Sequence, residues 1–335
     1  MDQSKWKRAF ALVTAILLIA AFGCGKAALD AEQPAEDPAK VVSIDSGNSA
    51  GADTAAAEHS GIYTVDGSTE TLSDGTYASS SPYENAVLVQ NAGQLKMASA
   101  DINKTGDAKN DFSDGINAAV AVLSKGQMTL SDSNITTSAF GAFGCSVSGT
   151  GSELSVSGSY VYTSGDSSPA LVVTNGGSAT VTGGILSTEG MDSACLMLSG
   201  GSATLSGVTL KTATNEFLRV FSGKNTLTLD ATTISANPIL GADALLQLKL
   251  INGASFTGEL GAELPAKVSV SLDVGSKLSL TAETYVSALV DADTTFQNIQ
   301  SNGFSLYYDS NAPENAYLNS QSFQLPGGGF LSPII

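Results

Sequence analysis

The sequence has few basic residues and few of the side chains that enzymes use most. Its 335 residues include 15 Lys and Arg against 32 Asp and Glu, three cysteines and one tryptophan, Trp6. The net charge of −17 argues against a nucleic-acid partner, because phosphate binding needs clustered Lys and Arg. It also argues against direct adsorption to anionic lipid. With His59 as the only histidine, no Ser-His-Asp catalytic arrangement is expected.

The first 23 residues have the pattern of a bacterial export signal. Three basic residues precede an apolar run from Ala9 to Phe22, which at 14 residues is too short for a typical membrane-spanning helix of about 20. The run ends in AFGC and resembles the lipobox of bacterial lipoproteins. The resemblance implies cleavage before Cys24 and lipidation of its thiol, with attachment to the membrane through buried acyl chains. An ordinary signal peptide that contains a cysteine is the alternative.

The residues after Cys24 predict a flexible tether. Residues 24–60 are rich in Ala, Gly, Ser, Pro and acids, as in AEQPAEDPAK from Ala31, and show no apolar periodicity. Gly25 follows the cysteine. In Gram-negative lipoproteins an aspartate at that position usually marks retention in the inner membrane, so glycine favours the outer membrane. We therefore expect a lipid-anchored protein of the cell envelope, at the outer membrane or cell surface, exposed outside the cytoplasm.

From Gly61 the chain repeats a unit of about 26 residues. LVVTNGGSATVTGGILSTEG from Leu171 matches LMLSGGSATLSGVTLKTATN from Leu196: an apolar run, a turn ending in glycine, then alternating Ser/Thr and apolar residues. The turn glycines align as Gly67, Gly93, Gly126, Gly151, Gly177, Gly201, Gly223, Gly253, Gly275 and Gly303. Short, β-branched segments with period two indicate strands that place one face inward.

The repeat predicts an all-β fold, a right-handed parallel β-helix. We expect a single-stranded solenoid of about ten coils over residues 61–335, with a C-terminal cap near Pro326–Pro333. A β-sandwich or barrel is the alternative, but it would not favour one turn glycine at the same offset in consecutive units. The repeats after Gly223 are irregular, with a leucine-rich run at Leu245–Leu250.

The two later cysteines are predicted to be free, buried thiols. Cys145 and Cys195 each lie six residues before an aligned glycine, at the offset of Leu171. All three would stack inward, with the cysteine Cα atoms two coils or about 9.6 Å apart, beyond the ~7 Å limit for a disulfide.

Two groups of polar residues are candidates for chemistry. Four side chains between Gly93 and Gly126 could offer oxygens to Ca²⁺, although a solvated acidic loop is the more common explanation: Asp107, Asn110, Asp111 and Asp114. Glu216, Arg219 and Asp230 could form a weak lyase-like group, although a surface ion pair is more common.

The candidates for ligand binding are aromatic. Tyr160 and Tyr162 share one face of a predicted strand and could stack a sugar ring, although packing on the same face is the simpler explanation. The hydrolase motifs of parallel β-helix enzymes, an Asn-Thr-Asp strand, a Gly-His-Gly and an Arg-Ile-Lys, are absent from the sequence.

Three segments resemble a family of bacterial exported β-helix proteins described as adhesin-like or autotransporter-passenger-like. They are YTVDGSTETLSDGTY with ENAVLV, GINAAVAVLSKGQMTLSDSNITTS, and FSLYYDSNAPENAYLNSQSFQLPGGGFL, from Tyr63, Gly115 and Phe304. With the repeats between them, the resemblance covers about residues 61–335. It implies surface placement and neither a reaction nor a cofactor.

The sequence therefore favours a non-enzymatic, lipid-anchored surface protein, adhesin-like, that binds a host or envelope partner such as a glycan or a surface protein. The alternative is a polysaccharide-binding or pectate-lyase-like polysaccharide-degrading β-helix. A structural spacer is the third hypothesis. A groove lined by carboxylates and a basic residue would favour the second hypothesis, and the sequence does not reveal one.

Replacing Cys24 tests the anchor. Metabolic labelling with a palmitate analogue should label the wild-type protein and leave Cys24→Ala unlabelled, because the thiol is the expected acceptor. Equal labelling of the two proteins would contradict the lipid assignment.

Overall fold

The computed structural model describes residues 58–108 and 115–334. Cys24, most of the predicted tether, and the candidate calcium ligands Asn110, Asp111 and Asp114 lie outside the described residues. None of the helices in the described ranges is sufficiently long and apolar to cross a membrane.

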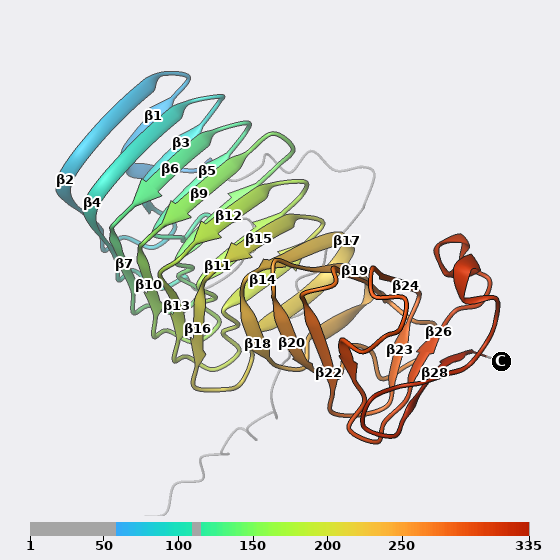
Figure 1. Ribbon diagram of the computed structural model, residues 1–335. Helices are drawn as coiled ribbons and strands as arrows, with labels where there is room; N and C mark the ends of the chain where they lie inside the picture. Colours follow the sequence, from blue (N-terminus) through green and yellow to red (C-terminus); the bar gives the residue numbers. More distant parts are fainter. Residues whose placement is uncertain (1–57, 109–114, 335) are drawn as a thin grey trace, which may run out of the picture. The chain divides into compact units, whose positions relative to one another are not determined.

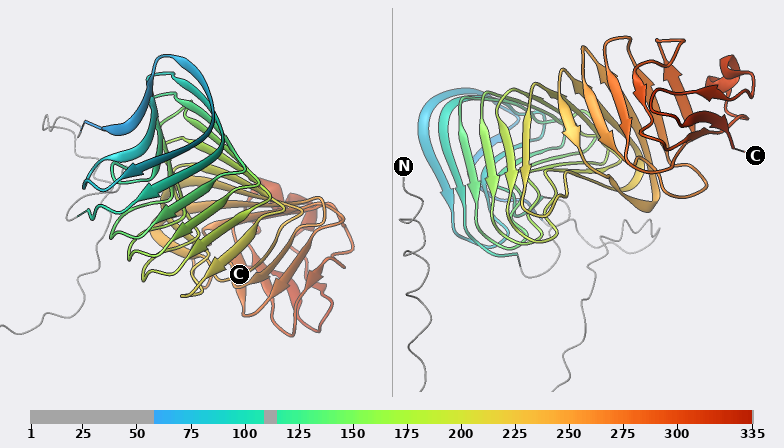
Figure 2. Two further views of the ribbon diagram at one scale, coloured as in Figure 1. Left: turned by 90° about the vertical axis from the view of Figure 1, so that its left-hand side faces the viewer. Right: turned by 60° about the horizontal axis from the view of Figure 1, so that its bottom comes forward.

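The predicted β-helix is confirmed. The described residues form a right-handed parallel β-solenoid of about eleven turns, with successive coils stacked from β1 toward β28 (Figures 1 and 2). Most coils contribute a strand to each of three sheets. All strand pairs are parallel except β27 with β28.

The first sheet begins each coil. Its strands are β1 (Gly61–Asp66), β3 (Asn85–Gln90), β5 (Val120–Leu123), β8 (Cys145–Ser148), β11 (Leu171–Thr174), β14 (Leu196–Ser199), and the N-terminal parts of β17 (Leu218–Asp230) and β19 (Ile239–Ile251).

The second sheet follows after a turn. Its strands are the N-terminal parts of β2 (Thr69–Ser79) and β4 (Gln94–Lys104), then β6 (Gln127–Ser131), β9 (Glu153–Ser157), β12 (Ser178–Thr182), β15 (Ser202–Ser206), the C-terminal parts of β17 and β19, β21 (Val268–Leu272) and β24 (Ala288–Asp291).

The third sheet closes the earlier coils. It comprises the C-terminal parts of β2 and β4, then β7 (Asn134–Thr137), β10 (Tyr160–Thr163), β13 (Ile185–Thr188) and β16 (Thr209–Thr212).

Two smaller sheets and a short helix complete the later coils. One sheet holds β18 (Thr233–Ser235), β20 (Ser255–Gly258), β22 (Lys277–Leu280) and β25 (Ile299–Gln300). The other holds β23 (Thr284–Val286), β26 (Leu306–Tyr308), β27 (Phe323–Gln324) and β28 (Phe330–Pro333). The 3₁₀ helix η1 spans Pro313–Leu318. The segment predicted to cap the C-terminal end therefore supplies a last strand, with Leu331 fully buried.

Inward side chains form continuous columns because the register is parallel. One column of the second sheet has members that are all at most 2% exposed: Leu95, Met128, Leu154, Ala179, Ala203, Leu227, Leu248, Val270 and Leu289. The period of two in the sequence thus becomes an apolar core inside the solenoid and a largely polar outer face on the second and third sheets. Leu246, Leu248 and Leu250 of the leucine-rich run follow the same rule and point inward. On the first sheet the outward residues are also buried: Leu88 and Ala121 form one separate apolar cluster, and Val172 and Met197 belong to another.

The turn between the first and second sheets requires a small residue. A Cβ atom on Gly126 would lie 2.6 Å from the carbonyl oxygen of Val89, and one on Gly201 would lie 2.7 Å from that of Val173. Both carbonyls belong to the preceding coil, so the close approach of stacked coils explains the repeated glycine.

The sequence alignment of this turn is wrong at six of the ten glycines. Thr69 pairs with Gln94, so Ser68 occupies the turn-glycine position in the first coil instead of Gly67. Glu153 pairs with Ser178, so Ser152 occupies the turn-glycine position instead of Gly151. Thr226 pairs with Ser202, which places Asn225 there instead of Gly223. Gly253 lies at a different corner, because β19 runs from the first sheet into the second without this turn. Gly275 lies at the corner between β21 and β22, and Gly303 lies between β25 and β26.

The cysteines are free and buried, as predicted. The prediction that they lie in the same inward column is wrong. Cys145 pairs with Leu171, and Leu171 pairs with Leu196, so Cys195 lies one residue before the column. The turn between β14 and β15 is one residue shorter than the turn between β11 and β12, so six residues before Gly201 is Cys195 and not the column residue Leu196. Burial raises the pKa of Cys145 to about 12 and that of Cys195 to about 11, so neither thiol ionises readily.

Candidate functional site

The outer face of the third sheet carries a pair of parallel aromatic rings. Tyr160 and Tyr162 on β10 alternate with buried Val161 and Thr163, so both rings point away from the core. Their centroids are 6.0 Å apart and their planes differ by 16°. The prediction that they share one face is confirmed, and both rings remain half-buried.

Tyr160 and Tyr162 each belong to an outward column of residues that pair from coil to coil. Toward the N-terminal coils, both columns continue with hydrogen-bonding side chains. Asn134 and Asp101 follow Tyr160, and the Asn134 Nδ2 donates to Asp101 Oδ1 at 3.0 Å. In the second column Thr136 follows Tyr162, and its hydroxyl donates to Asn103 Oδ1. Amide, carboxylate and hydroxyl groups thus lie within one or two rungs of the rings, a rung being about 4.8 Å.

Tyr162 is fixed by a carboxylate from the next coil. Its hydroxyl donates to Glu189 Oε2 at 2.6 Å. This hydrogen bond is the main reason that the pKa of Tyr162 is raised above its ordinary value. The phenol therefore stays protonated, and its ring is held by a partner at its outer tip.

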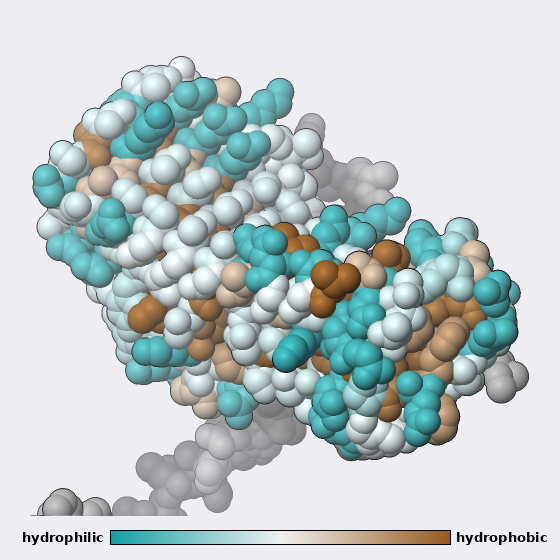
Figure 3. All heavy atoms as spheres, viewed as in Figure 1, coloured by the Kyte–Doolittle hydropathy of each residue, from teal (hydrophilic) through white to brown (hydrophobic). Residues whose placement is uncertain are grey.

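The neighbouring second sheet presents an outer face whose central column is uncharged over five coils. Its central outward column, in coils three to seven, consists of Thr129, Ser155, Thr180, Thr204 and Thr228. Figure 3 shows this region as a pale area over β6, β9, β12 and β15. Lys96 precedes the column and Lys249 follows it.

A cleft opens where the first sheet is interrupted. In the described residues 259–267 no strand forms, so no first-sheet strand stacks on Leu240 at the start of β19. The resulting cleft has a volume of about 260 Å³. Leu240 is only half-buried there, whereas Leu260 is 1% exposed.

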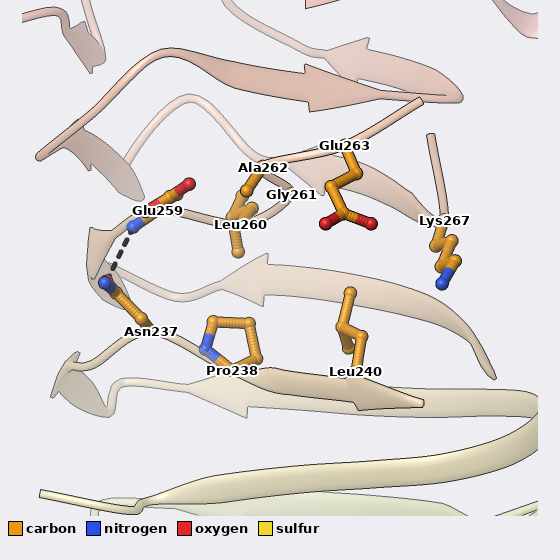
Figure 4. Close-up of a pocket in the computed structure, with 9 residues that line it drawn as sticks. All are labelled: Asn237, Pro238, Leu240, Glu259, Leu260, Gly261, Ala262, Glu263 and Lys267. Atoms are coloured by element: carbon orange, nitrogen blue, oxygen red, sulfur yellow. Dashed lines mark hydrogen bonds between the residues drawn. The ribbon is translucent and has the colours of Figure 1, made fainter. Parts of the chain in front are cut away.

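The cleft combines two carboxylates with one ammonium group. Figure 4 shows Glu263, Lys267 and Leu240 toward one end and Glu259 with Asn237 at the other. Asn237 Oδ1 accepts the backbone N–H of Glu259 at 2.9 Å, and Lys267 Nζ donates to the carbonyl of Gly241 at 3.1 Å.

Sequence reasoning missed this cleft. The available signal was the paired GEL and GAELP segments from Gly258 to Pro265, which break the strand pattern with two glycines and a proline.

The calcium candidates are represented in the structure by Asp107 alone. Its carboxylate is exposed, and Oδ1 accepts the backbone N–H of Phe140 at 2.8 Å. Within residues 58–108 and 115–334, no three Asp, Glu, His or Cys side chains form a cluster that could hold a metal ion.

The lyase-like group does not assemble. Arg219 contacts Glu216 at 2.5 Å and Asp192 at 3.5 Å, and its guanidinium lies 5.9 Å from the centre of the Phe221 ring. Asp230 lies at the other end of β17, where its carboxylate accepts from Ser206 and Asn252. The pairing of Glu216 with Arg219 is the ion pair that the sequence favoured.

Comparison of the chain with protein-family models, curated proteins and solved structures finds no match. The fold therefore stands on the strand pairing, and the function must be argued from the surface itself.

Proposed function

We propose that the protein is a non-enzymatic, lipid-anchored surface protein that binds a glycan through the outer face of its third sheet. The observation that carries this proposal is the parallel pair Tyr160 and Tyr162, with Asn134 and Asp101 in line with it. Sugar rings present apolar C–H faces and a rim of hydroxyls. Aromatic rings pack against the former, and amides and carboxylates hydrogen-bond the latter.

The rigid backbone favours such a ligand. Side chains on stacked parallel strands are positioned by the sheet, so little conformational entropy is lost when a ligand binds. A column of groups repeating about every 4.8 Å also suits an extended polymer better than a small solute. The acidic surface favours neutral or cationic glycans over acidic ones.

The anchor and the solenoid fit one arrangement. The AFGC motif would place lipid at Cys24, and the residues up to 60 would connect it to the first coil. A binding face on a surface-attached solenoid matches the adhesin-like character that the resemblance implies.

Removing the two rings tests this function. On a glycan array, residues 25–335 should bind a limited set of glycans, and Tyr160→Ala/Tyr162→Ala should weaken binding on the order of tenfold, because aromatic pairs contribute ~0.5–1.5 kcal/mol beyond their buried area. Tyr285→Ala/Tyr307→Ala is the matched control, since it removes another stacked pair, with centroids 5.1 Å apart.

Unchanged binding by the Tyr160/Tyr162 variant would place the site elsewhere. Absence of binding to every glycan would reject the function and leave the structural spacer.

A second candidate, polysaccharide degradation, is favoured by the cleft. Glycosidases use a pair of carboxylates, and lyases need a base, so Glu259, Glu263 and Lys267 supply the required residue types. Incubation with pectin and related polymers, followed by 235 nm absorbance and reducing-end measurements, distinguishes the two functions. We expect no product. Product release that disappears in Glu263→Gln would establish the enzyme instead.

A further inference from the structure

A lysine is fully buried at a corner of the second coil. Lys104, the last residue of β4, is 0% exposed. It pairs with Thr137, which begins a column that continues through Thr163 and Thr188. In the next two coils the threonine hydroxyl bridges the corner: Thr137 donates to the carbonyl of Ala142 at 2.8 Å, and Thr163 donates to that of Ser168 at 2.5 Å. Lys104 takes this position in the coil with the longest connection to the next first-sheet strand, residues 105–119 between β4 and β5, which we call the insertion.

The lysine amine and a buried asparagine amide meet at one carbonyl. Lys104 Nζ donates to the carbonyl oxygens of Ser81 at 2.7 Å and Gly106 at 3.0 Å. Asn117 is also 0% exposed, and its Nδ2 donates to the same Gly106 oxygen at 2.9 Å. The two nitrogens are therefore close together, although the residues are 13 positions apart in the sequence.

The surroundings activate both groups. Burial lowers the pKa of Lys104 to about 8, against the opposing effect of Glu84 and Asp107, so a neutral, nucleophilic amine is accessible near neutral pH. The backbone N–H of Tyr83 donates to Asn117 Oδ1 at 2.9 Å. A donor at this position would stabilise negative charge on the amide oxygen during attack at the amide carbon.

A carboxylate acts electrostatically on the amine: Glu84 opposes the lowering of the Lys104 pKa by burial. Glu84 Oε2 accepts the hydroxyl of Ser79 at 2.9 Å, and Ser79 pairs with Lys104 across adjacent coils. Glu84 would supply the base that moves a proton from the attacking amine to the leaving nitrogen.

We propose that Lys104 and Asn117 form an intramolecular isopeptide bond. Lys104 Nζ attacks Asn117 Cγ, the Nζ–Cγ bond forms, and the Cγ–Nδ2 bond breaks. One proton passes from Nζ to the departing nitrogen, which leaves as ammonia. The products are a secondary amide and ammonia, and no oxidant or reductant is required.

The bond would close the insertion covalently. It joins the end of β4 to the segment before β5 and would supply a covalent link in the described solenoid, where Cys145 and Cys195 are free thiols. Such a link restricts the unfolded chain and blocks proteolysis that depends on opening this coil.

Peptide mapping of the full chain tests the proposal without relying on any variant. After denaturation and trypsin digestion, residues 97–109 should appear joined to 110–125, uncut after Lys104, with a mass about 17 Da below the sum of the two peptides, the mass of ammonia lost. Tandem fragmentation should place the link between Lys104 and Asn117. Separate, unmodified peptides 97–104 and 110–125 would overturn the proposal, as would a link to any other residue.

Three variants sharpen the assignment. Lys104→Arg keeps the charge but removes the primary amine, and Asn117→Ala removes the acceptor, so each should give only separate peptides. Lys125→Arg is the matched control, since this exposed lysine lies in the same digest and trypsin still cleaves after arginine. The joined peptide should persist there, and its loss would contradict the assigned pair.

Discussion

Backbone hydrogen bonding between successive coils determines where every side chain of the solenoid lies. Because neighbouring strands are parallel and in register, a residue at one rung directly covers its counterpart on the rung below. The inward columns are therefore mostly apolar side chains stacked on one another, and the turn at Gly126 and Gly201 leaves no room for a Cβ atom. The outward columns are free of that constraint, and function can be carried there.

The same register explains the two exceptions to the regular coil. At Lys104 the threonine column is interrupted because a longer corner must be bridged, and an amine reaches carbonyls that a hydroxyl would not. At residues 259–267 the first-sheet strand is missing, so Leu240 loses its covering rung and a cleft appears. Both features lie where the repeat length or pattern departs from the rest.

The sequence was sufficient to predict the solenoid, because period two and a recurrent turn glycine are direct consequences of stacking. It was not sufficient for exact register: an extra residue before Ser152 and the polar Asn225 in a glycine position displaced the alignment by one or two residues. The Tyr160 and Tyr162 face followed from the same periodicity. The cleft, and the convergence of Lys104 and Asn117 on the Gly106 carbonyl, depend on which coils stack, and the local sequence does not reveal that.

The net charge and the surface side chains together favour a neutral glycan as the proposed ligand. An acidic protein presents an uncharged Ser/Thr column beside an aromatic pair with amide and carboxylate neighbours. These groups can hold a neutral polymer by stacking and hydrogen bonding, without the clustered cations that an anionic ligand would need.

Register is the claim on which these assignments depend, and engineered cysteines measure it directly. Thr180 and Thr204 pair on adjacent coils, and Thr204 pairs in turn with Thr228 on the following coil. Thr180 and Thr228 are therefore two coils apart. Thr180→Cys/Thr204→Cys should form a disulfide on mild oxidation, because one rung is about 4.8 Å, and Thr180→Cys/Thr228→Cys should not, because two rungs exceed the ~7 Å limit. A disulfide in the second pair without one in the first would contradict the account.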